Sequence, residues 1–313
     1  MMRSSARHLS TTVAVGALLA GAAAVPVAGS AASASPGANG RIVYVGFNGV
    51  HIDLYTINPD GSGRRRITDN RTIEGSPAWS ARGRRIAYTA YDSTAPFDAE
   101  IYTIRPDGSG RRQITDNTFD DSTPAWSPTG RRMAFTGYDG ADHEIYTIRP
   151  DGSGRRRVTD NTSFESTPAW SPNGKRIAFH STNRTRSALY TIRPDGSGRR
   201  RVTDITTYDD DVYDVSPSWS PNGKRIVYQG FDGTDYEIYT IRPDGSGRRR
   251  VTDNTIDDQS PSWSPDGLRI AYQSTDAYGD YEIYKILAAG GGVRRRVTDN
   301  ITTDFSPDWG IAP

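Results

Sequence analysis

The chain has no cysteine among its 313 residues, and only 3 of its 38 basic residues are lysine. The absence of cysteine excludes disulfides, thiolate metal sites and cysteine nucleophiles. Hydrophobic residues make up only 35%, which is low for a helix-rich enzyme core, whereas 10% aromatic residues is too many for a disordered chain. Acidic and basic residues nearly cancel, so the net charge of +1 predicts no partner.

The first 34 residues have the composition of a secretory signal peptide. Arg3 and Arg7 form a basic start, residues 13–24 are apolar, and Ala32-Ser33-Ala34 supplies small residues for cleavage. The apolar stretch is too short to span a bilayer. We therefore predict a cleaved signal at residues 1–34, a linker at 35–40 and export to the periplasm or the extracellular space, with no transmembrane segment.

Everything after residue 40 is one pattern that repeats. The six tryptophans stand at positions 79, 126, 170, 219, 263 and 309, each within Ser/Thr-Pro-x-Trp. Two further phrases accompany them, Arg-Ile-Ala-Tyr as at residues 85–88 and Ile-Tyr-Thr-Ile-Arg-Pro-Asp-Gly-Ser-Gly as at 101–110. A last run, typically Arg-Arg-Val-Thr, completes the unit. Four short runs rich in β-branched and aromatic residues, punctuated by Gly, Pro, Asn and Asp, predict four antiparallel strands per unit.

Repeated four-stranded units predict an all-β fold, a six-bladed β-propeller over residues 41–313. The pattern opens at Arg41 with the second strand of a unit and ends near Trp309 with the first strand of another. We expect these ends to build one shared blade that closes the ring; an open solenoid would leave the last strand unpaired. The first strand of each unit should lie innermost, and the repeated Trp, Tyr and Ile side chains should fill the space between blades.

The phrases Ser-Pro-x-Trp-Ser-Pro-x-Gly-Lys/Arg-Arg-Ile-Ala-Tyr and Ile-Tyr-x-Ile resemble the TolB-type propeller repeat, found in TolB and in the propellers of prolyl-oligopeptidase relatives. The resemblance covers residues 41–313 in six copies. It implies a six-bladed propeller that binds proteins or other ligands. Two features of those relatives are missing from the pattern, the N-terminal domain of TolB and the hydrolase domain that follows an oligopeptidase propeller.

An acidic residue stands three positions before the strand proline in all six units. These six residues, referred to below as the ring acids, are Glu74, Asp121, Glu165, Asp214, Asp258 and Asp304. We expect them at one mouth of the central channel, where they either cap their own loops or form a port for a cation or a basic partner side chain. No cofactor is required by the sequence, and a weak Ca²⁺ site would involve Asp121, Asp214 and Asp258 first.

Charge also separates along the repeat. Most acids fall in the connections between second and third strands and between successive units, which share one face of a propeller, and the arginine triplets are assigned to the other face. The triplets either protect the outer strands from edge pairing or bind anionic cell-wall polymers or phosphate-rich surfaces.

Few residues suggest catalysis. His51, His143 and His180 occupy no repeated position, and no nucleophile elbow, metal-binding histidine pair or phosphate loop occurs. We predict an exported, non-enzymatic binding propeller, a monomer that engages a protein or cell-envelope ligand, and no nucleic acid, through its acidic face and channel mouth. The alternative is a secreted propeller hydrolase acting on carbohydrate or a related polymer, with acids such as Asp120-Asp121 or residues 209–211 as its catalytic pair.

Overall fold

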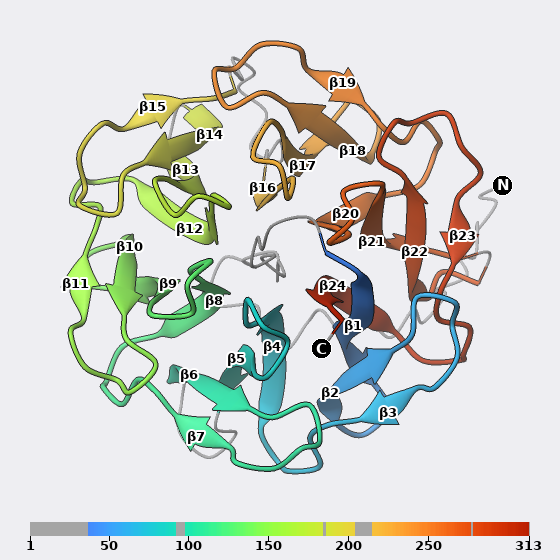
Figure 1. Ribbon diagram of the computed structural model, residues 1–313, viewed down its shortest axis with the longest axis horizontal. Coiled ribbons are helices and arrows are strands. Elements are labelled where there is room, and N and C mark those ends of the chain that lie inside the picture. The colour runs from blue at the N-terminus through green and yellow to red at the C-terminus, as the bar shows by residue number, and fades with distance from the viewer. Residues whose placement is uncertain (1–36, 92–97, 184–185, 204–214, 277, 313) are drawn as a thin grey trace, which may run out of the picture.

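The computed structural model describes residues 37–91, 98–183, 186–203, 215–276 and 278–312, which form a ring of six four-stranded antiparallel sheets (Figure 1). The predicted signal peptide lies outside the described residues. None of the described segments forms a helix long and apolar enough to cross a membrane. The all-β, six-bladed architecture predicted from the repeat is confirmed.

Each blade orders its strands from the axis of the ring outward. The innermost strands carry the Pro-x-Trp phrase: β24 (Asp304–Ile311), β4 (Ile73–Trp79), β8 (Asp121–Trp126), β12 (Phe164–Trp170), β16 (Val215–Trp219) and β20 (Asp258–Trp263). The second strands are β1 (Asn39–Phe47), β5 (Ile86–Tyr91), β9 (Met133–Tyr138), β13 (Ile177–Asn183), β17 (Ile226–Phe231) and β21 (Arg269–Thr275). The third strands are β2 (Ile52–Ile57), β6 (Ala99–Ile104), β10 (His143–Ile148), β14 (Arg186–Ile192), β18 (Tyr236–Ile241) and β22 (Tyr281–Leu287).

The outermost strands are shorter than the four-residue runs predicted for them. They comprise two residues each: β3 (Arg65–Arg66), β7 (Arg112–Gln113), β11 (Arg156–Arg157), β15 (Arg200–Arg201), β19 (Arg249–Arg250) and β23 (Arg295–Arg296). The threonine that follows leaves the ladder because its hydroxyl caps the third strand. In one blade Thr115 Oγ1 accepts a hydrogen bond from the Ile101 N–H at 2.8 Å.

The two ends of the chain build one blade, as predicted. Strand β24 pairs antiparallel with β1, with Trp309 opposite Ile42. Strand β1 begins at Asn39, two residues before the predicted start of the propeller, because Asn39 pairs with Ile311 and its amide donates to Asp266 Oδ2 at 2.8 Å. The ring therefore closes through strand pairing, and an open solenoid is excluded.

The core consists of six apolar clusters, each shared by two neighbouring blades. In one of them Trp126 and Phe135 pack with Ala78 and Ile101 of the preceding blade, and all four are buried. This confirms that the repeated aromatic and aliphatic residues fill the space between blades, where burying each large side chain contributes about 1.5–3 kcal/mol.

A bulge interrupts every innermost strand at the residue before its proline. These residues have φ between 47° and 60°, a conformation that non-glycine residues rarely adopt: Ser76, Thr123, Thr167, Ser216, Ser260 and Ser306. The bulge turns the backbone N–H toward the preceding blade. Thr123 N donates to Thr89 Oγ1 at 3.0 Å, and Ser260 N donates to Gln229 Oε1 at 2.8 Å. These inter-blade hydrogen bonds help hold the strained conformation in place.

Candidate functional site

Five ring acids lie in the described part of the chain, and all are buried. The exposed fraction is 1% for Glu74 and 0% for Asp121, Glu165, Asp258 and Asp304, whereas Asp214 lies outside the described residues. In each of these five blades the asparagine four residues upstream donates its side-chain N–H to the carboxylate, at 2.7–2.9 Å. The asparagine thus occupies one carboxylate oxygen in each of these five blades.

In four blades whose ring acid is described, the first arginine of the triplet lies across its blade toward that acid. The Arg155 guanidinium lies 4.5 Å from the centroid of the Tyr146 ring and places a nitrogen 2.7 Å from Asp121 Oδ2. In the next blade Arg199 approaches Glu165 at 2.8 Å. Two ring acids are therefore paired inside their own blade, with the arginine stacked on an aromatic ring.

The distance between the arginine and the ring acid differs between blades with phenylalanine and blades with tyrosine at one position of the second strand. Blades with Phe135 or Phe179 in the second strand have the short contacts just described. Where that position is Tyr44, the hydroxyl accepts a hydrogen bond from Arg64 Nε at 2.8 Å, and Arg64 comes no closer to Asp304 than 3.9 Å. In this blade the tyrosine hydroxyl thus competes with the ring acid for the same guanidinium.

Burial raises the pKa of every described ring acid, to about 7 for Glu74, Glu165 and Asp304 and to about 6 for Asp121 and Asp258. Loss of solvent is the largest cause in each case, and the hydrogen bond from the asparagine opposes it. Only one group of three acids in the described segments has ligand oxygens within 4.8 Å of one another, and it contains no ring acid. A cation port at the ring therefore stays a prediction.

The third arginine of the triplet lies on the acidic face, so the assignment of whole triplets to the opposite face is wrong. Arg157 contacts Glu144 at 3.0 Å and both Asp139 and Asp160 at 2.8 Å. Arg250 and Arg296 each contact three carboxylates in the same way. The outer strand runs toward that face, so its last arginine ends beside the acids.

The second arginine bridges neighbouring blades. Its guanidinium donates to a backbone carbonyl in the next blade's turn between third and fourth strands, for example from Arg112 to Asp151 O at 3.0 Å and from Arg156 to Asp195 O at 2.9 Å. Each arginine of the triplet therefore has its own role, which a repeated Arg-Arg-Arg phrase does not reveal.

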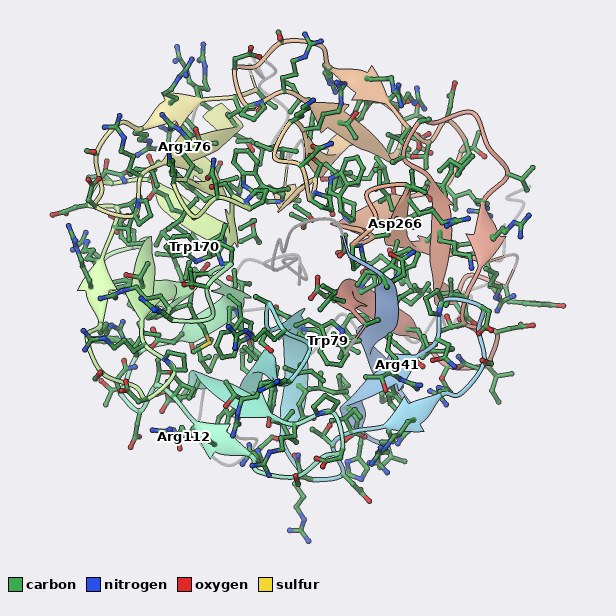
Figure 2. All side chains as sticks on the ribbon, viewed as in Figure 1. Arg41, Trp79, Arg112, Trp170, Arg176 and Asp266 are labelled. Carbon is green, nitrogen blue, oxygen red and sulfur yellow. The ribbon has the colours of Figure 1, made fainter. Side chains whose placement is uncertain are left out.

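The remaining arginines lie on the opposite face of the ring. Because the strands are antiparallel, the turns between first and second strands and between third and fourth strands all lie on this face. Arg41, Arg112 and Arg176 mark this set in three blades around the ring (Figure 2). We define the arginine face by the three arginines that recur in four blades: Arg85, Arg105, Arg112, Arg132, Arg149, Arg156, Arg176, Arg193, Arg200, Arg225, Arg242 and Arg249.

The arginine face is held by neutral oxygens. Arg176 donates to Thr191 Oγ1 at 3.0 Å and to Gly198 O at 3.1 Å, and Arg193 donates to Ser197 Oγ at 3.2 Å. No described carboxylate forms an ion pair with any of the twelve arginines. Burial, followed by the charges of Arg200 and Arg193, lowers the pKa of Arg176. Four turn aspartates, Asp107, Asp151, Asp195 and Asp244, lie beside these twelve arginines without ion-pair contacts, so an excess of positive charge remains on this face.

Grooves cross the arginine face between blades. One of about 480 Å³ is lined by Arg85, Arg112, Arg131 and Arg149, together with Asp151, the turn aspartate. The aspartate offsets part of the charge, but its Oδ1 already accepts hydrogen bonds from the backbone and hydroxyl of Ser153. The groove therefore presents several guanidinium groups to one ligand.

The residues considered for catalysis have structural contacts. His180 is buried between Ser166 and Ser187, and burial lowers its pKa to about 3, too low for a general base near neutral pH. Asp120 Oδ1 accepts a hydrogen bond from the Ala99 N–H at 2.9 Å. Residues 209–211 lie outside the described segments.

The matches to known proteins cover the repeated part of the chain. The family model described as TolB beta propeller domain matches residues 36–233 and 209–311. TolB from Acinetobacter baumannii superposes with a TM-score of 0.76 at 21% identity, covering 87% of this chain and 67% of that one. A putative TolB from Agrobacterium tumefaciens gives 0.67 at 20% identity, covering 84% and 90%. A segment of 36 residues is 56% identical to dipeptidyl-peptidase 5 of Porphyromonas gingivalis, which is 12% of this chain but only 5% of the peptidase.

Proposed function

We propose that this chain, which belongs to the TolB β-propeller domain family, acts after export as a non-enzymatic binding propeller, and that its partner contacts the arginine face. The observation that carries this proposal is the repeated arginine group without carboxylate partners in four blades. Uncompensated charge is costly to a fold unless a ligand uses it, and it attracts a partner of opposite sign from a distance.

The partner class that fits is an anionic polymer with repeating phosphate groups. Guanidinium groups bind phosphate oxygens in pairs and are weakly hydrated, which favours contact with such a polymer. A ring that repeats the same group in successive blades offers a multivalent surface, in which each group adds to the avidity. The closed ring holds these groups at fixed positions, so little ordering accompanies binding.

The acidic face, which the sequence predicted to engage the partner, is a weaker candidate for the binding surface. Its buried carboxylates are bonded to the third arginine and to asparagines within the blade, as for Glu144 with Arg157 and Asp121 with Asn117. The charge that is left for a ligand is thus greater on the arginine face than at the ring acids.

The test is binding of the purified chain to inorganic polyphosphate at several salt concentrations. The double variant Arg149→Gln/Arg193→Gln removes two exposed guanidiniums, each of which donates a hydrogen bond to a turn serine. We expect weaker binding and a salt dependence whose slope falls by about one for each lost contact. The matched control is Arg71→Gln/Arg186→Gln, which removes two exposed arginines from the acidic face.

Equal loss in both double variants would show that net charge rather than the arginine face drives binding. Absence of binding by the parent at low salt would reject an anionic polymer as the partner class. Robust hydrolysis of glycans or esters, abolished by Asp121→Ala, would instead support the hydrolase alternative.

A further inference from the structure

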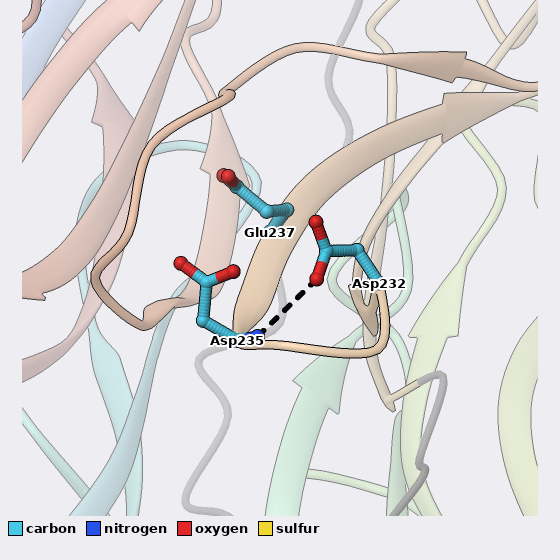
Figure 3. Close-up of side chains that lie close together, drawn as sticks. All are labelled: Asp232, Asp235 and Glu237. Carbon is cyan, nitrogen blue, oxygen red and sulfur yellow. Dashed lines mark hydrogen bonds between the residues drawn. The ribbon is translucent and has the colours of Figure 1, made fainter.

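A cluster of three carboxylates forms in one turn of the acidic face. Asp232 and Asp235 lie in the turn between β17 and β18, and Glu237 is the second residue of β18. Each contributes one oxygen to a group in which all ligand atoms lie within 4.8 Å of one another. Figure 3 shows the three carboxylates around a common space, with Asp235 bonded through its backbone to Asp232.

The turn itself is shaped by Asp232, whose Oδ1 accepts hydrogen bonds from Thr234 N at 2.8 Å and from Asp235 N at 3.2 Å. Arg250 lies beside the cluster, 2.8 Å from Asp232 Oδ2 and 2.6 Å from Glu237 Oε1. It also contacts the exposed Asp253 at 3.0 Å. The arginine compensates one of the three cluster charges and leaves the others.

Asp235 is buried, although contacts within the fold do not compensate the burial of its carboxylate. The residue is 6% exposed, and neither carboxylate oxygen accepts a hydrogen bond from a described donor, while the neighbouring side chain is another carboxylate, Asp232. Glu237 is fully buried and its Oε2 also has no partner, although its Oε1 accepts from Asn254 N at 2.6 Å. Unpartnered buried carboxylate oxygens are costly, and here three of them belong to neighbouring side chains.

Negative charge exceeds positive charge around the turn. Arg250 contacts Asp232 and Glu237, and it shares its positive charge with Asp253 as well. The three cluster carboxylates are therefore neutralised only in part, and a divalent cation would offset the remaining negative charge.

We propose that Asp232, Asp235 and Glu237 bind a divalent cation of the Ca²⁺ class. Calcium takes roughly six to eight oxygen ligands, so three carboxylates with water completing the shell provide a weak site. Weak extracellular sites of this kind have dissociation constants of about 10⁻⁴–10⁻³ M. This turn lies between second and third strands and contains none of the ring acids.

The other blades provide a comparison within the molecule. The turn between β9 and β10 has the same letters at the same spacing, with Asp139, Asp142 and Glu144 beside Arg157. Asp142 is only half-buried there, and the carboxylate oxygens of these three residues do not all come within 4.8 Å of one another, as those of Asp232, Asp235 and Glu237 do. Burial and convergence, rather than the phrase, single out the turn at Asp232.

The experiment is calorimetric titration of the full chain with CaCl₂, combined with thermal unfolding at 10 mM Ca²⁺ and in chelator. We expect a dissociation constant of about 0.1–1 mM and a midpoint raised by about 2–4 °C, because the cation binds only the folded state. Asp235→Asn should weaken binding at least about tenfold while unfolding in chelator no earlier than the parent, since it removes an unpartnered charge. Asp235→Ser serves as a second variant should the amide not fold.

Asp142→Asn is the matched control and should keep the full calcium response. A parent that neither releases heat nor gains stability with calcium overturns the proposal. So does a response that survives Asp235→Asn, or one that is lost equally in Asp142→Asn. A response that is lost in Asp121→Asn/Asp258→Asn but kept in Asp235→Asn assigns calcium to the ring acids instead.

Discussion

Asp308, in the last strand of the chain, accepts a hydrogen bond on Oδ2 from the backbone N–H of Trp79 in the next blade at 2.7 Å. Its Oδ1 accepts from the Ser262 hydroxyl of the preceding blade at 3.1 Å, and the side chain is fully buried. The other five blades have alanine or serine at this position. The shared blade therefore carries one side chain that joins it to both neighbours.

Replacing Asp308 should weaken the closure of the ring. Asp308→Ala leaves the Trp79 N–H buried without its acceptor, and we expect a loss of about 2–3 kcal/mol in the free energy of unfolding. Asp308→Asn keeps an acceptor for Trp79 and should be much closer to the parent. Denaturant unfolding measures both.

The matched control for Asp308→Ala is Ser218→Ala, because Ser218 Oγ accepts the Trp263 N–H at a longer 3.4 Å. We expect a cost of less than about 1 kcal/mol there. Equal costs for Asp308→Ala and Ser218→Ala would mean that the closing blade is held no differently from the others.

Removal of residues 305–313 should destabilise the entire ring. The deletion takes away all of β24 except Asp304 and leaves β1 without its inner partner and Trp79 without Asp308. Exposed edges and an open ring should lower the unfolding midpoint by at least about 10 °C or prevent folding. The control is deletion of residues 312–313, beyond the end of β24. An unchanged midpoint for the longer deletion would contradict closure by the shared blade.

The blade number and the shared blade followed from sequence because they depend on repetition, which residue spacing records directly. The orientation of the ring acids could not be predicted from residue spacing. Asp121 stands five residues before Trp126, and an odd separation in a regular strand predicts opposite faces of the sheet. Their partners in β9 are Gly137 and Met133, four residues apart, because the bulge at Thr123 adds one residue.

The bulge thus puts the acid on the same face as the tryptophan, beneath the arginine that stacks on Tyr146. A positive φ at Thr123, a residue that seldom adopts it, has no strong sequence signal. The polar residue that accepts its N–H, Thr89, is separated by 34 residues and belongs to another blade. Hydrogen bonds between blades, such as this one, depend on how the blades pack in the ring. The sequence of a single repeat therefore does not predict them.

Stability should rise as the pH falls from 8 to 5.5. Burial raises the pKa of eight described acids to about 6 or 7: Glu74, Glu100, Asp121, Glu165, Asp235, Asp258, Asp304 and Asp308. A raised folded pKa means that the folded state binds protons that the unfolded chain, with a pKa near 4, has already released. Stability is therefore lower above pH 7 and recovers toward pH 4.

Two histidines act in the opposite direction, because burial lowers the pKa of His143 and His180. They are outnumbered, so we expect the thermal midpoint to rise by at least about 3 °C between pH 8 and pH 5.5. Scanning calorimetry across this range measures it, and Asp308→Asn should flatten the profile. A midpoint that falls steadily over the same range would show that the acids are ionised at little cost.

Glu100 is the buried acid that lacks the arginine found in other blades. Arg66, Arg157, Arg250 and Arg296 contact the corresponding acids, but the blade of Glu100 has Gln113 at that position. Glu100 is 4% exposed, its Oε2 has no partner, and burial raises its pKa to about 7.

Gln113→Arg should therefore stabilise the protein by about 1 kcal/mol at pH 8, because a charge-assisted hydrogen bond reaches a buried carboxylate that lacks one. The thermal midpoint should rise by about 2–4 °C, and the gain should shrink at pH 5.5, where Glu100 is protonated. The matched converse is Arg157→Gln, which removes the arginine from Glu144 but leaves its hydrogen bond from Asn161 N at 2.6 Å, and it should cost about 1–2 kcal/mol. If Gln113→Arg gains the same stability in a Glu100→Gln background, the arginine acts through its aliphatic stem and not through the carboxylate.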